Sequence, residues 1–337
     1  MKAVLVTKPF EISIVDIPKP VIKENTDVLI KVIAGGICGS DVAIFNGTNS
    51  LATYPRIIGH EFCGRVVEVG SDVTNVSIGD IVAVDPVNSC GKCDACTGGH
   101  HNVCEFLEVS GVHRDGGFSE YYLSKEDNCH VLRFYNDEAE AALVEPYSIG
   151  SEINHQARIN NKDFVVVMGS GPIGITAMQI AKSRGAVVLM TDLLESRLIR
   201  AKKMGADFVL NVSQNNLAEN ILSYCQRKPS VIVDTVCSVS SPVEAMKLAA
   251  PAGRVVILGT RKDPSEIPQV LFTMKELEVI GSRLSNNRFP EVINFFEENK
   301  GINSDLVTHS FNFEQVADAI NTVIEHPEEV CKVQLKF

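Results

Sequence analysis

The second half of the chain contains six continuous apolar runs, which constrain the fold more strongly than any other feature. Helix-like segments such as 175–184 and 195–204 separate them. A strand that is apolar throughout is buried on both faces, so its alternation with helices predicts a parallel, doubly wound α/β sheet. The runs are FVVVMG (164–169), VVLMTD (187–192), DFVLN (207–211), VIVDTV (231–236), RVVILG (254–259) and LEVIGS (277–282).

The first 150 residues have a different sequence pattern. Short β-branched runs at 28–33, 64–70 and 80–86 are broken by Gly, Pro, Asn and Asp, which is typical of an all-β, barrel-like domain. Further on, the helix-like FPEVINFFEEN precedes the strand-like VCKVQLKF, and we expect this tail to rejoin the first domain. A length of 337 residues suits about two domains. We predict one domain from 1–149 with 291–337, and a second from 150–290.

A glycine-rich loop connects the first of the six apolar runs to a helix-like segment. It has the pattern G-x-G-x-x-G, in which the first glycine allows a tight turn and the second lets the backbone approach a pyrophosphate. The third glycine permits close packing of helix and strand, and the helix N-terminus faces the phosphates. This context predicts a dinucleotide site rather than an ordinary βα turn. The residues are Gly169, Ser170, Gly171, Pro172, Ile173 and Gly174.

Asp192 ends the next apolar run. A carboxylate at this place accepts hydrogen bonds from the ribose hydroxyls and repels a 2′-phosphate, which favours NAD over NADP. As an alternative, Asp192 caps the helix that begins in LLESR. Arg197 lies nearby in the sequence and either binds a 2′-phosphate, lies over the adenine or faces solvent.

Four cysteines lie within fifteen residues, at Cys90, Cys93, Cys96 and Cys104. Their spacing, C-x2-C-x2-C-x7-C, lets the thiolates converge on one tetrahedral ion and leaves no position open. The pattern predicts a closed, structural zinc site. The rest of the ten cysteines do not form a dense disulfide framework, which indicates a reducing compartment.

A second set of metal-ligand types lies outside this lobe. Cys38, His60, Glu61 and Glu145 offer one thiolate, one imidazole and two carboxylates, all of which suit zinc. Their separation in the sequence does not show whether they meet in space.

The segment 59–73 has the pattern GHE-x2-G-x5-G-x2-V, and with it the chain resembles the zinc-containing medium-chain alcohol dehydrogenases. The four-cysteine lobe, the GHE segment, the pair Glu145-Pro146 and the GSGPIG loop occur in the order of that family. The resemblance therefore covers nearly the whole chain. It implies a GroES-like β domain with two zinc sites and a Rossmann domain that binds NAD.

The resemblance also implies roles for single residues. Cys38 and His60 match zinc ligands, and either Glu61 or Glu145 supplies the carboxylate. Ser40 matches the hydroxyl that accepts the alcohol proton, and Asp41 matches a carboxylate that orients the imidazole of His60. Many relatives carry a histidine five residues after the cysteine as the outer end of the proton relay, whereas this chain has alanine there, at position 43. The relay must therefore end elsewhere.

Three sequence segments resemble those of one branch of the family, the sorbitol, threonine and L-galactonate dehydrogenases. They are SGVHRDGGFSEYY (110–122), VEPYSIG (144–150) and GSRLSNN (281–287). They are most similar to hexonate 5-dehydrogenases, such as L-gulonate and L-galactonate enzymes and the related starvation-sensing oxidoreductases. This similarity implies NAD-linked oxidation of the C5 hydroxyl of a sugar acid. The alternatives are a neutral polyol dehydrogenase, an L-threonine dehydrogenase and a non-catalytic regulator that senses NADH.

A hexonate pocket needs a donor for the substrate carboxylate, and the planar fork of arginine suits that role. We expect His113, Arg283 and Asn286 to hold the acid end or the distal hydroxyls. As an alternative, Arg283 ties the two domains together or binds the cofactor.

The overall composition limits the partners. A net charge of −11 and a pI near 5.3 argue against a nucleic-acid partner, which would favour a basic face. The first residues lack the apolar core of a signal peptide, and no apolar stretch approaches the roughly 20 residues of a membrane helix. We therefore expect a cytoplasmic protein. The family resemblance implies a homodimer or homotetramer formed through the edge of the Rossmann sheet, with LEVIGS near that edge.

Overall fold

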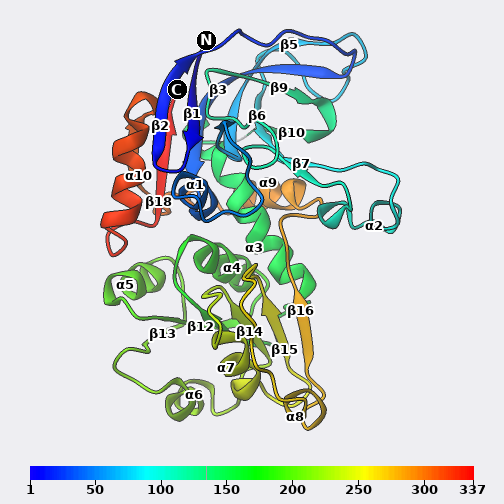
Figure 1. Cartoon of the computed structure of the whole chain (residues 1–337). Coiled ribbons are helices and arrows are strands. Elements are labelled where there is room, and N and C mark those ends of the chain that lie inside the picture. The colour runs from blue at the N-terminus through cyan, green and yellow to red at the C-terminus, as the bar shows by residue number, and fades with distance from the viewer. Residues whose placement is uncertain (134) are drawn as a thin grey trace. The chain divides into compact units, whose positions relative to one another are not determined.

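Two separate sets of sheets divide the chain into two units (Figure 1). The computed structural model describes residues 1–133 and 135–337. Unit 1 is discontinuous in sequence and comprises Met1–Glu145 and Ser285–Phe337, and unit 2 comprises Pro146–Leu284.

Unit 2 contains one sheet of six strands, all parallel, in the order β13-β12-β11-β14-β15-β16. Each strand corresponds to one of the six apolar runs, which confirms the predicted parallel, doubly wound fold class. The strand order reverses between β11 and β14, and in such sheets ligands bind beyond the carboxyl ends of the strands at this point. The strands are β11 (Phe164–Met168), β12 (Val187–Asp192), β13 (Phe208–Asn211), β14 (Val231–Asp234), β15 (Arg254–Ile257) and β16 (Glu278–Gly281).

Helices connect these strands and pack on the sheet, as Figure 1 shows. They bury a continuous core in which Phe164, Val166, Leu189, Ile232 and Val255 are all inaccessible to solvent. The helices of this unit are α4 (Pro172–Ser183), α5 (Glu195–Lys203), α6 (Leu217–Cys225), α7 (Ser241–Leu248) and α8 (Val270–Thr273). Helix α3 (Val144–Gln156) begins in unit 1 and contributes most of its length to unit 2.

Unit 1 consists mainly of strands. Its largest sheet has the order β10-β6-β5-β3-β18-β17, with β9 also paired to β3, and a smaller sheet has the order β2-β1-β4. The strands are β1 (Lys2–Lys8), β2 (Glu11–Asp16), β3 (Asp27–Ile37), β4 (Arg56–Ile57), β5 (Glu61–Val69), β6 (Ile81–Val84), β7 (Val87–Asn88), β8 (Glu108–Val109), β9 (Tyr121–Lys125), β10 (Cys129–Leu132), β17 (Val307–Asn312) and β18 (Lys332–Lys336).

The long strand β3 organises unit 1 because it pairs with three other strands. Its first half pairs with β9 and its second half with β18, while β5 runs along its other edge. Strand β18, from the strand-like tail VCKVQLKF, therefore lies beside the end of β3. The helices of this unit are α1 (Gly39–Phe45), α2 (Asp94–Thr97), α9 (Phe289–Glu298) and α10 (Val316–Glu325).

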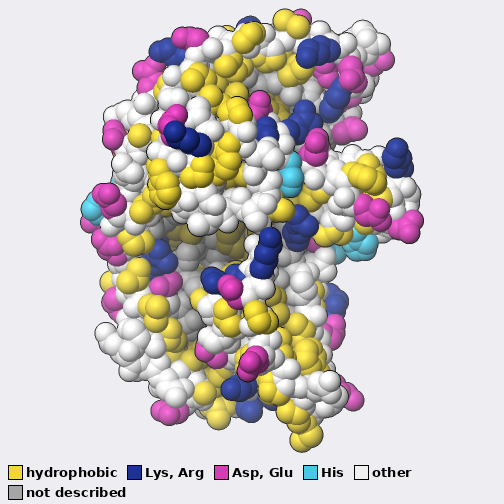
Figure 2. Space-filling view, viewed as in Figure 1, with side chains coloured by type: hydrophobic (Ala, Val, Ile, Leu, Met, Phe, Trp, Pro, Cys, Tyr) yellow, Lys and Arg dark blue, Asp and Glu magenta, His cyan; other side chains and the backbone are white. Residues whose placement is uncertain are grey.

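The surface shows both signs of charge. On the face seen in Figure 2, acidic and basic side chains are scattered among apolar and uncharged ones. Across the described residues 1–133 and 135–337, no helix is both long enough and apolar enough to span a bilayer.

Candidate functional site

The glycine-rich loop has the geometry that its sequence predicts. Gly169 adopts a φ of +97°, a left-handed conformation that favours glycine. A Cβ on Gly174 would lie 2.1 Å from the carbonyl oxygen of Gly169, so only glycine lets the helix approach the strand this closely. A Cβ on Gly171 would meet nothing within 4 Å, which leaves its backbone open to a ligand. Gly171 is also the N-cap of α4, and Pro172 occupies the first turn.

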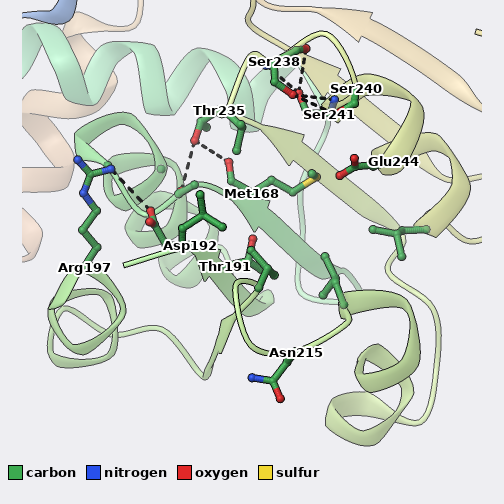
Figure 3. A pocket seen from close by; sticks show the side chains of 18 of the residues that line it. Met168, Thr191, Asp192, Arg197, Asn215, Thr235, Ser238, Ser240, Ser241 and Glu244 are labelled. Carbon is green, nitrogen blue, oxygen red and sulfur yellow. Dashed lines mark hydrogen bonds and ion pairs between the residues drawn. The ribbon is translucent and has the colours of Figure 1, made fainter. Parts of the chain in front are cut away.

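This loop lines a cavity of about 870 Å³ at the carboxyl ends of the parallel strands. Met168 and Gly169 enter it from the end of β11, Thr191 and Asp192 from β12, and Thr235 follows β14. The cavity therefore lies at the point where the strand order reverses, and its volume suits a dinucleotide. Figure 3 shows the labelled residues around it.

Asp192 is held by the loop itself. Its Oδ2 accepts a hydrogen bond from Ser170 N at 2.8 Å, and its Oδ1 accepts one from Leu194 N at 3.0 Å. The N-cap of α5 is Leu194, so the alternative in which Asp192 caps that helix is wrong. Arg197 lines the same cavity, and its guanidinium lies 3.9 Å from Asp192 Oδ2 (Figure 3).

The cavity also has a polar wall that the sequence analysis did not single out. Thr235 Oγ1 donates to Met168 O at 2.7 Å and so ties the end of β14 to the end of β11. Hydroxyl groups from the start of α7 and the loop before it extend this wall (Figure 3). These residues are Ser238, Ser240 and Ser241. The run SVSS was the available signal, but serines are common in loops and carry no pattern of their own.

The four cysteines of the lobe converge as predicted. Their sulfur–sulfur distances include 3.5 Å for Cys93–Cys96, 3.8 Å for Cys93–Cys104 and 4.0 Å for Cys90–Cys96. A tetrahedron with metal–sulfur bonds of about 2.3 Å has edges of roughly 3.8 Å, so the donor set fits zinc. Hydrogen bonds from backbone N–H groups lower the pKa of the Cys93 thiol, whereas burial raises the pKa of its neighbour Cys96, so Cys93 is the first of the two to form the thiolate that a metal binds.

The second set of ligand types also meets in space. Ligand atoms of Cys38, His60 and Glu61 all lie within 4.8 Å of one another. Strand pairing explains the proximity, because Gly36 near the end of β3 lies opposite Glu61 at the start of β5. One thiolate, one imidazole and one carboxylate form the donor set of a zinc site that keeps a fourth position open.

Glu145, the other carboxylate, is buried near this set at the start of α3. Burial raises the pKa of its carboxyl group to about 8, an effect that nearby His60 opposes and Glu61 reinforces. The two glutamates therefore interact, and both belong to the surroundings of Cys38 and His60.

Asp41 connects the two loops that carry these ligands. Its Oδ2 accepts from Cys38 N at 2.9 Å and its Oδ1 from Gly59 N at 3.1 Å. The same Oδ1 lies 3.7 Å from His60 Nδ1. Burial disfavours the charged imidazole, but Asp41 and then Cys38 more than offset this and hold the pKa of His60 well above its usual value. On the other side of the ring, Ser40 Oγ lies 3.5 Å from Nε2.

Lys332 is a member of this cluster that the sequence analysis missed. Its Nζ lies 2.7 Å from both carboxylate oxygens of Glu61, and the two side chains are 3% and 1% exposed. Burial disfavours the ammonium, yet Glu61 and Cys38 raise its pKa above the ordinary value. The available signal was a lysine in a strand, KVQLK, whose first four residues are all buried.

Two of the three residues predicted to bind substrate make other contacts. His113 Nδ1 accepts a hydrogen bond from Val109 N at 3.0 Å, within the turn that follows β8. Asn286 Nδ2 donates to Gly99 O at 2.9 Å and so anchors the four-cysteine lobe. Arg283 is exposed on the segment after β16, in unit 2.

Comparisons with known proteins identify the family. A family model described as "Alcohol dehydrogenase GroES-like domain" matches residues 24–133, and one described as "Zinc-binding dehydrogenase" matches residues 172–298. These two models together match most of the chain, which belongs to the zinc-type, medium-chain alcohol dehydrogenases and is an enzyme of that class.

Three relatives are similar over nearly their whole length. The starvation-sensing protein RspB of Escherichia coli K12 is 42% identical, over 100% of this chain and 99% of its own. Sorbitol dehydrogenase of Bacillus subtilis is 34% identical (99% and 97%), and L-galactonate-5-dehydrogenase of E. coli K12 is 30% identical (93% and 92%). A crystal structure of RspB from E. coli CFT073, complexed with NADH, matches with a TM-score of 0.94 at 40% identity, covering 100% and 99% of the two chains.

These findings agree with the residues. Zinc and a nicotinamide dinucleotide are the cofactors of this class, and the cysteine lobe, the Cys38 cluster and the glycine-loop cavity fit them. Polyols and sugar acids are the broad substrate class of the relatives.

Proposed function

We propose that this enzyme oxidises a secondary hydroxyl, at C5, of a sugar acid of the L-gulonate or L-galactonate type and transfers the hydride to NAD. The observation that supports the chemistry best is the convergence of Cys38, His60 and Glu61 with a serine hydroxyl beside them. The L-galactonate-5-dehydrogenase relative supports the substrate class.

In this proposal Cys38, His60 and Glu61 hold the catalytic zinc, and Cys90, Cys93, Cys96 and Cys104 hold a structural one. When bound, the catalytic zinc supplies Lewis-acid polarisation of the substrate hydroxyl. Glu145 remains the alternative carboxylate ligand, since it is buried near the same set.

The chain's own residues prepare and complete the proton transfer. Ser40 accepts the hydroxyl proton at Oγ, which lies 3.5 Å from His60 Nε2. Asp41 keeps the ring of His60 in place through the two loops that it connects. Because residue 43 is alanine, the proton would leave Ser40 to Glu145, to water or, with the cofactor bound, to one of its ribose hydroxyls.

The cofactor preference follows from Asp192. Its carboxylate lines the cavity beyond the end of β12, where ribose hydroxyls are bound in sheets of this order. A 2′-phosphate would meet this negative charge, so we propose NAD rather than NADP. Gly169, Gly171, Pro172, Ile173 and Gly174 hold the pyrophosphate, and Arg197, which lines the same cavity, lies over the adenine.

Substrate recognition is proposed for Arg283, with His113 and Asn286 as further candidates. The donor fork of arginine suits a carboxylate. The contacts of His113 with Val109 and of Asn286 with Gly99 make these two the weaker candidates. The neutral polyol alternative is supported by the sorbitol dehydrogenase relative, and L-threonine follows it. A non-catalytic NADH sensor has no chemical need for the Cys38 cluster.

We also propose that the enzyme is a homodimer or homotetramer that assembles through β16. This strand ends the six-stranded order, and α8, which precedes it in the chain, has no buried residue. Val270 and Met274, in and next to α8, are 54% and 77% exposed. This assembly is tested by measuring the molar mass of the wild type and of Met274→Asp by light scattering. A charge on the proposed contact surface should lower the molar mass of the variant.

The function is tested by following NADH absorbance with NAD against a panel of hexonates and matched neutral polyols. Turnover of a 5-hydroxy hexonate that Cys38→Ala abolishes supports the proposal. Arg283→Ala should raise the KM for the hexonate strongly and leave a neutral polyol unaffected. Turnover of polyols alone would refute the sugar-acid assignment, and no turnover with zinc bound would favour the NADH sensor.

A further inference from the structure

The lysine of β18 is placed beside the proposed metal ligands by the backbone. Val333 pairs with Ile37, the residue before Cys38, so Lys332 lies next to the end of β3. Across the other edge of β3, Gly36 pairs with Glu61. The ends of β18 and β5 thus flank β3 from opposite sides, and their side chains meet over it.

A glycine in β3 makes room for this meeting. A Cβ on Gly36 would lie 2.3 Å from Glu61 Oε2 and 3.3 Å from Lys332 Cδ. The carboxylate and the lysine stem therefore occupy the space that a side chain of residue 36 would fill. Lys332 Nζ also lies 3.4 Å from Ile37 O, which fixes the ammonium at the end of β3.

The pair leaves Glu61 able to bind a metal as well. A carboxylate has about four lone-pair sites, and contacts from Nζ to both oxygens use two of them. The ammonium has donors only and so does not compete as a ligand. A buried carboxylate without a cation is strongly disfavoured, and the ammonium of Lys332 offsets part of that cost in the absence of a metal.

We infer that Lys332 is a positioning residue for the metal site: through both oxygens it holds Glu61 in the orientation that makes Glu61, rather than Glu145, the third protein ligand of zinc. This inference rests on the proposed function, because it presumes that Cys38 and His60 bind that ion. It assigns to the tail of the chain a part in a site whose other members come from the first half.

The test is zinc affinity, measured by chelator competition with the purified full-length enzyme. The two proposed zinc ions should be released to the chelator in two steps. The step that is absent in Cys38→Ala belongs to this site, and the other step, from the four-cysteine lobe, serves as an internal reference. Lys332→Met should weaken zinc binding at this site by about 10- to 100-fold, the usual effect of losing a group that orients a ligand. The step of the cysteine lobe should stay unchanged. Lys336→Met, on the same strand with an exposed side chain, is the matched control and should bind zinc as the wild type does.

Two further variants keep the result decisive if Lys332→Met folds poorly. Glu61→Gln removes the charge that needs a partner, so Glu61→Gln with Lys332→Met should fold and bind zinc no more weakly than Glu61→Gln alone. Additive losses would show that Lys332 acts without Glu61 and would overturn the inference. The inference would also be overturned if Lys332→Met bound zinc with wild-type affinity. A third contrary result would be a loss of zinc affinity in Glu145→Gln with no such loss in Glu61→Gln. A wild type that binds only the zinc of the cysteine lobe would instead refute the proposed function.

Discussion

Asp85 allows a quantitative test of how the burial of a carboxyl group in unit 1 affects the stability of the protein. Its side chain is 7% exposed, and burial raises the pKa of its carboxyl group to about 7, although a hydrogen bond from Val87 N to Oδ1 opposes the shift. Asparagine has nearly the same shape and keeps the acceptor for Val87 N, but it cannot ionise. We therefore expect Asp85→Asn to stabilise the protein at neutral pH.

The size of the effect follows from proton linkage. Between pH 4 and pH 7 the folded protein holds a proton on Asp85 that the unfolded chain has released, so the free energy of unfolding falls as pH rises through this window. A difference of roughly 3 pKa units corresponds to about 4 kcal/mol. The stability gain of Asp85→Asn should therefore grow from near zero at pH 4 to on the order of 4 kcal/mol at pH 8.

The assay is urea unfolding of both proteins from pH 4 to pH 8, followed by circular dichroism because the chain has no tryptophan. Asp127→Asn is the matched control, since Asp127 is exposed and should show no such trend. A stability difference that does not change with pH, or an Asp85→Asn protein that is less stable than wild type at pH 8, would refute the reasoning.

Three further predictions concern other parts of the molecule. Asp192→Ala should shift the ratio of kcat/KM for NAD over NADP towards NADP by at least about tenfold, because the charge that repels a 2′-phosphate is gone; an unchanged ratio in initial-rate assays would contradict this. Cys104→Ser should release one zinc per chain and lower the Tm, as metal analysis and calorimetry would show, whereas retention of two zinc ions would argue against the four-thiolate site. Burial lowers the pKa of His130 to about 4, so stability should be lost as pH falls from about 6.5 to 4. His130→Phe, which keeps an aromatic ring against Phe289, should reduce that loss in acid unfolding, and an identical pH profile would count against it.

The fold and the cofactor loop could be predicted because their signals are local. A parallel strand is buried on both faces, so each of the six runs, such as 164–169 and 187–192, is apolar without interruption. The glycines at 169 and 174 are required by a positive φ and by a close approach within six residues of chain. The four cysteines likewise converge within one short lobe.

The surroundings of Glu61 could not be predicted in the same way. The contact between Glu61 and Lys332 joins residues 271 positions apart, and neither residue's neighbours indicate it. Asn286 shows the same limit, because its partner is a backbone carbonyl at Gly99, and a carbonyl has no signature in the sequence. Such contacts depend on the register of strands and loops, which only the three-dimensional pairing determines.

The discontinuity of unit 1 also sets an order of events during synthesis. Strands β3 and β5, with Cys38 and Glu61, leave the ribosome well before β18, because the whole of unit 2 lies between them in the chain. At about 5–20 residues per second, a segment of this length takes on the order of ten seconds or more to be made. During that time the edge of β3 that pairs with β18 has no partner strand. Glu61 likewise has no ion-pair partner, because Lys332 has not yet been synthesised. All of unit 2 is synthesised before β18, and the sheet of unit 1 is completed only after β18 has emerged.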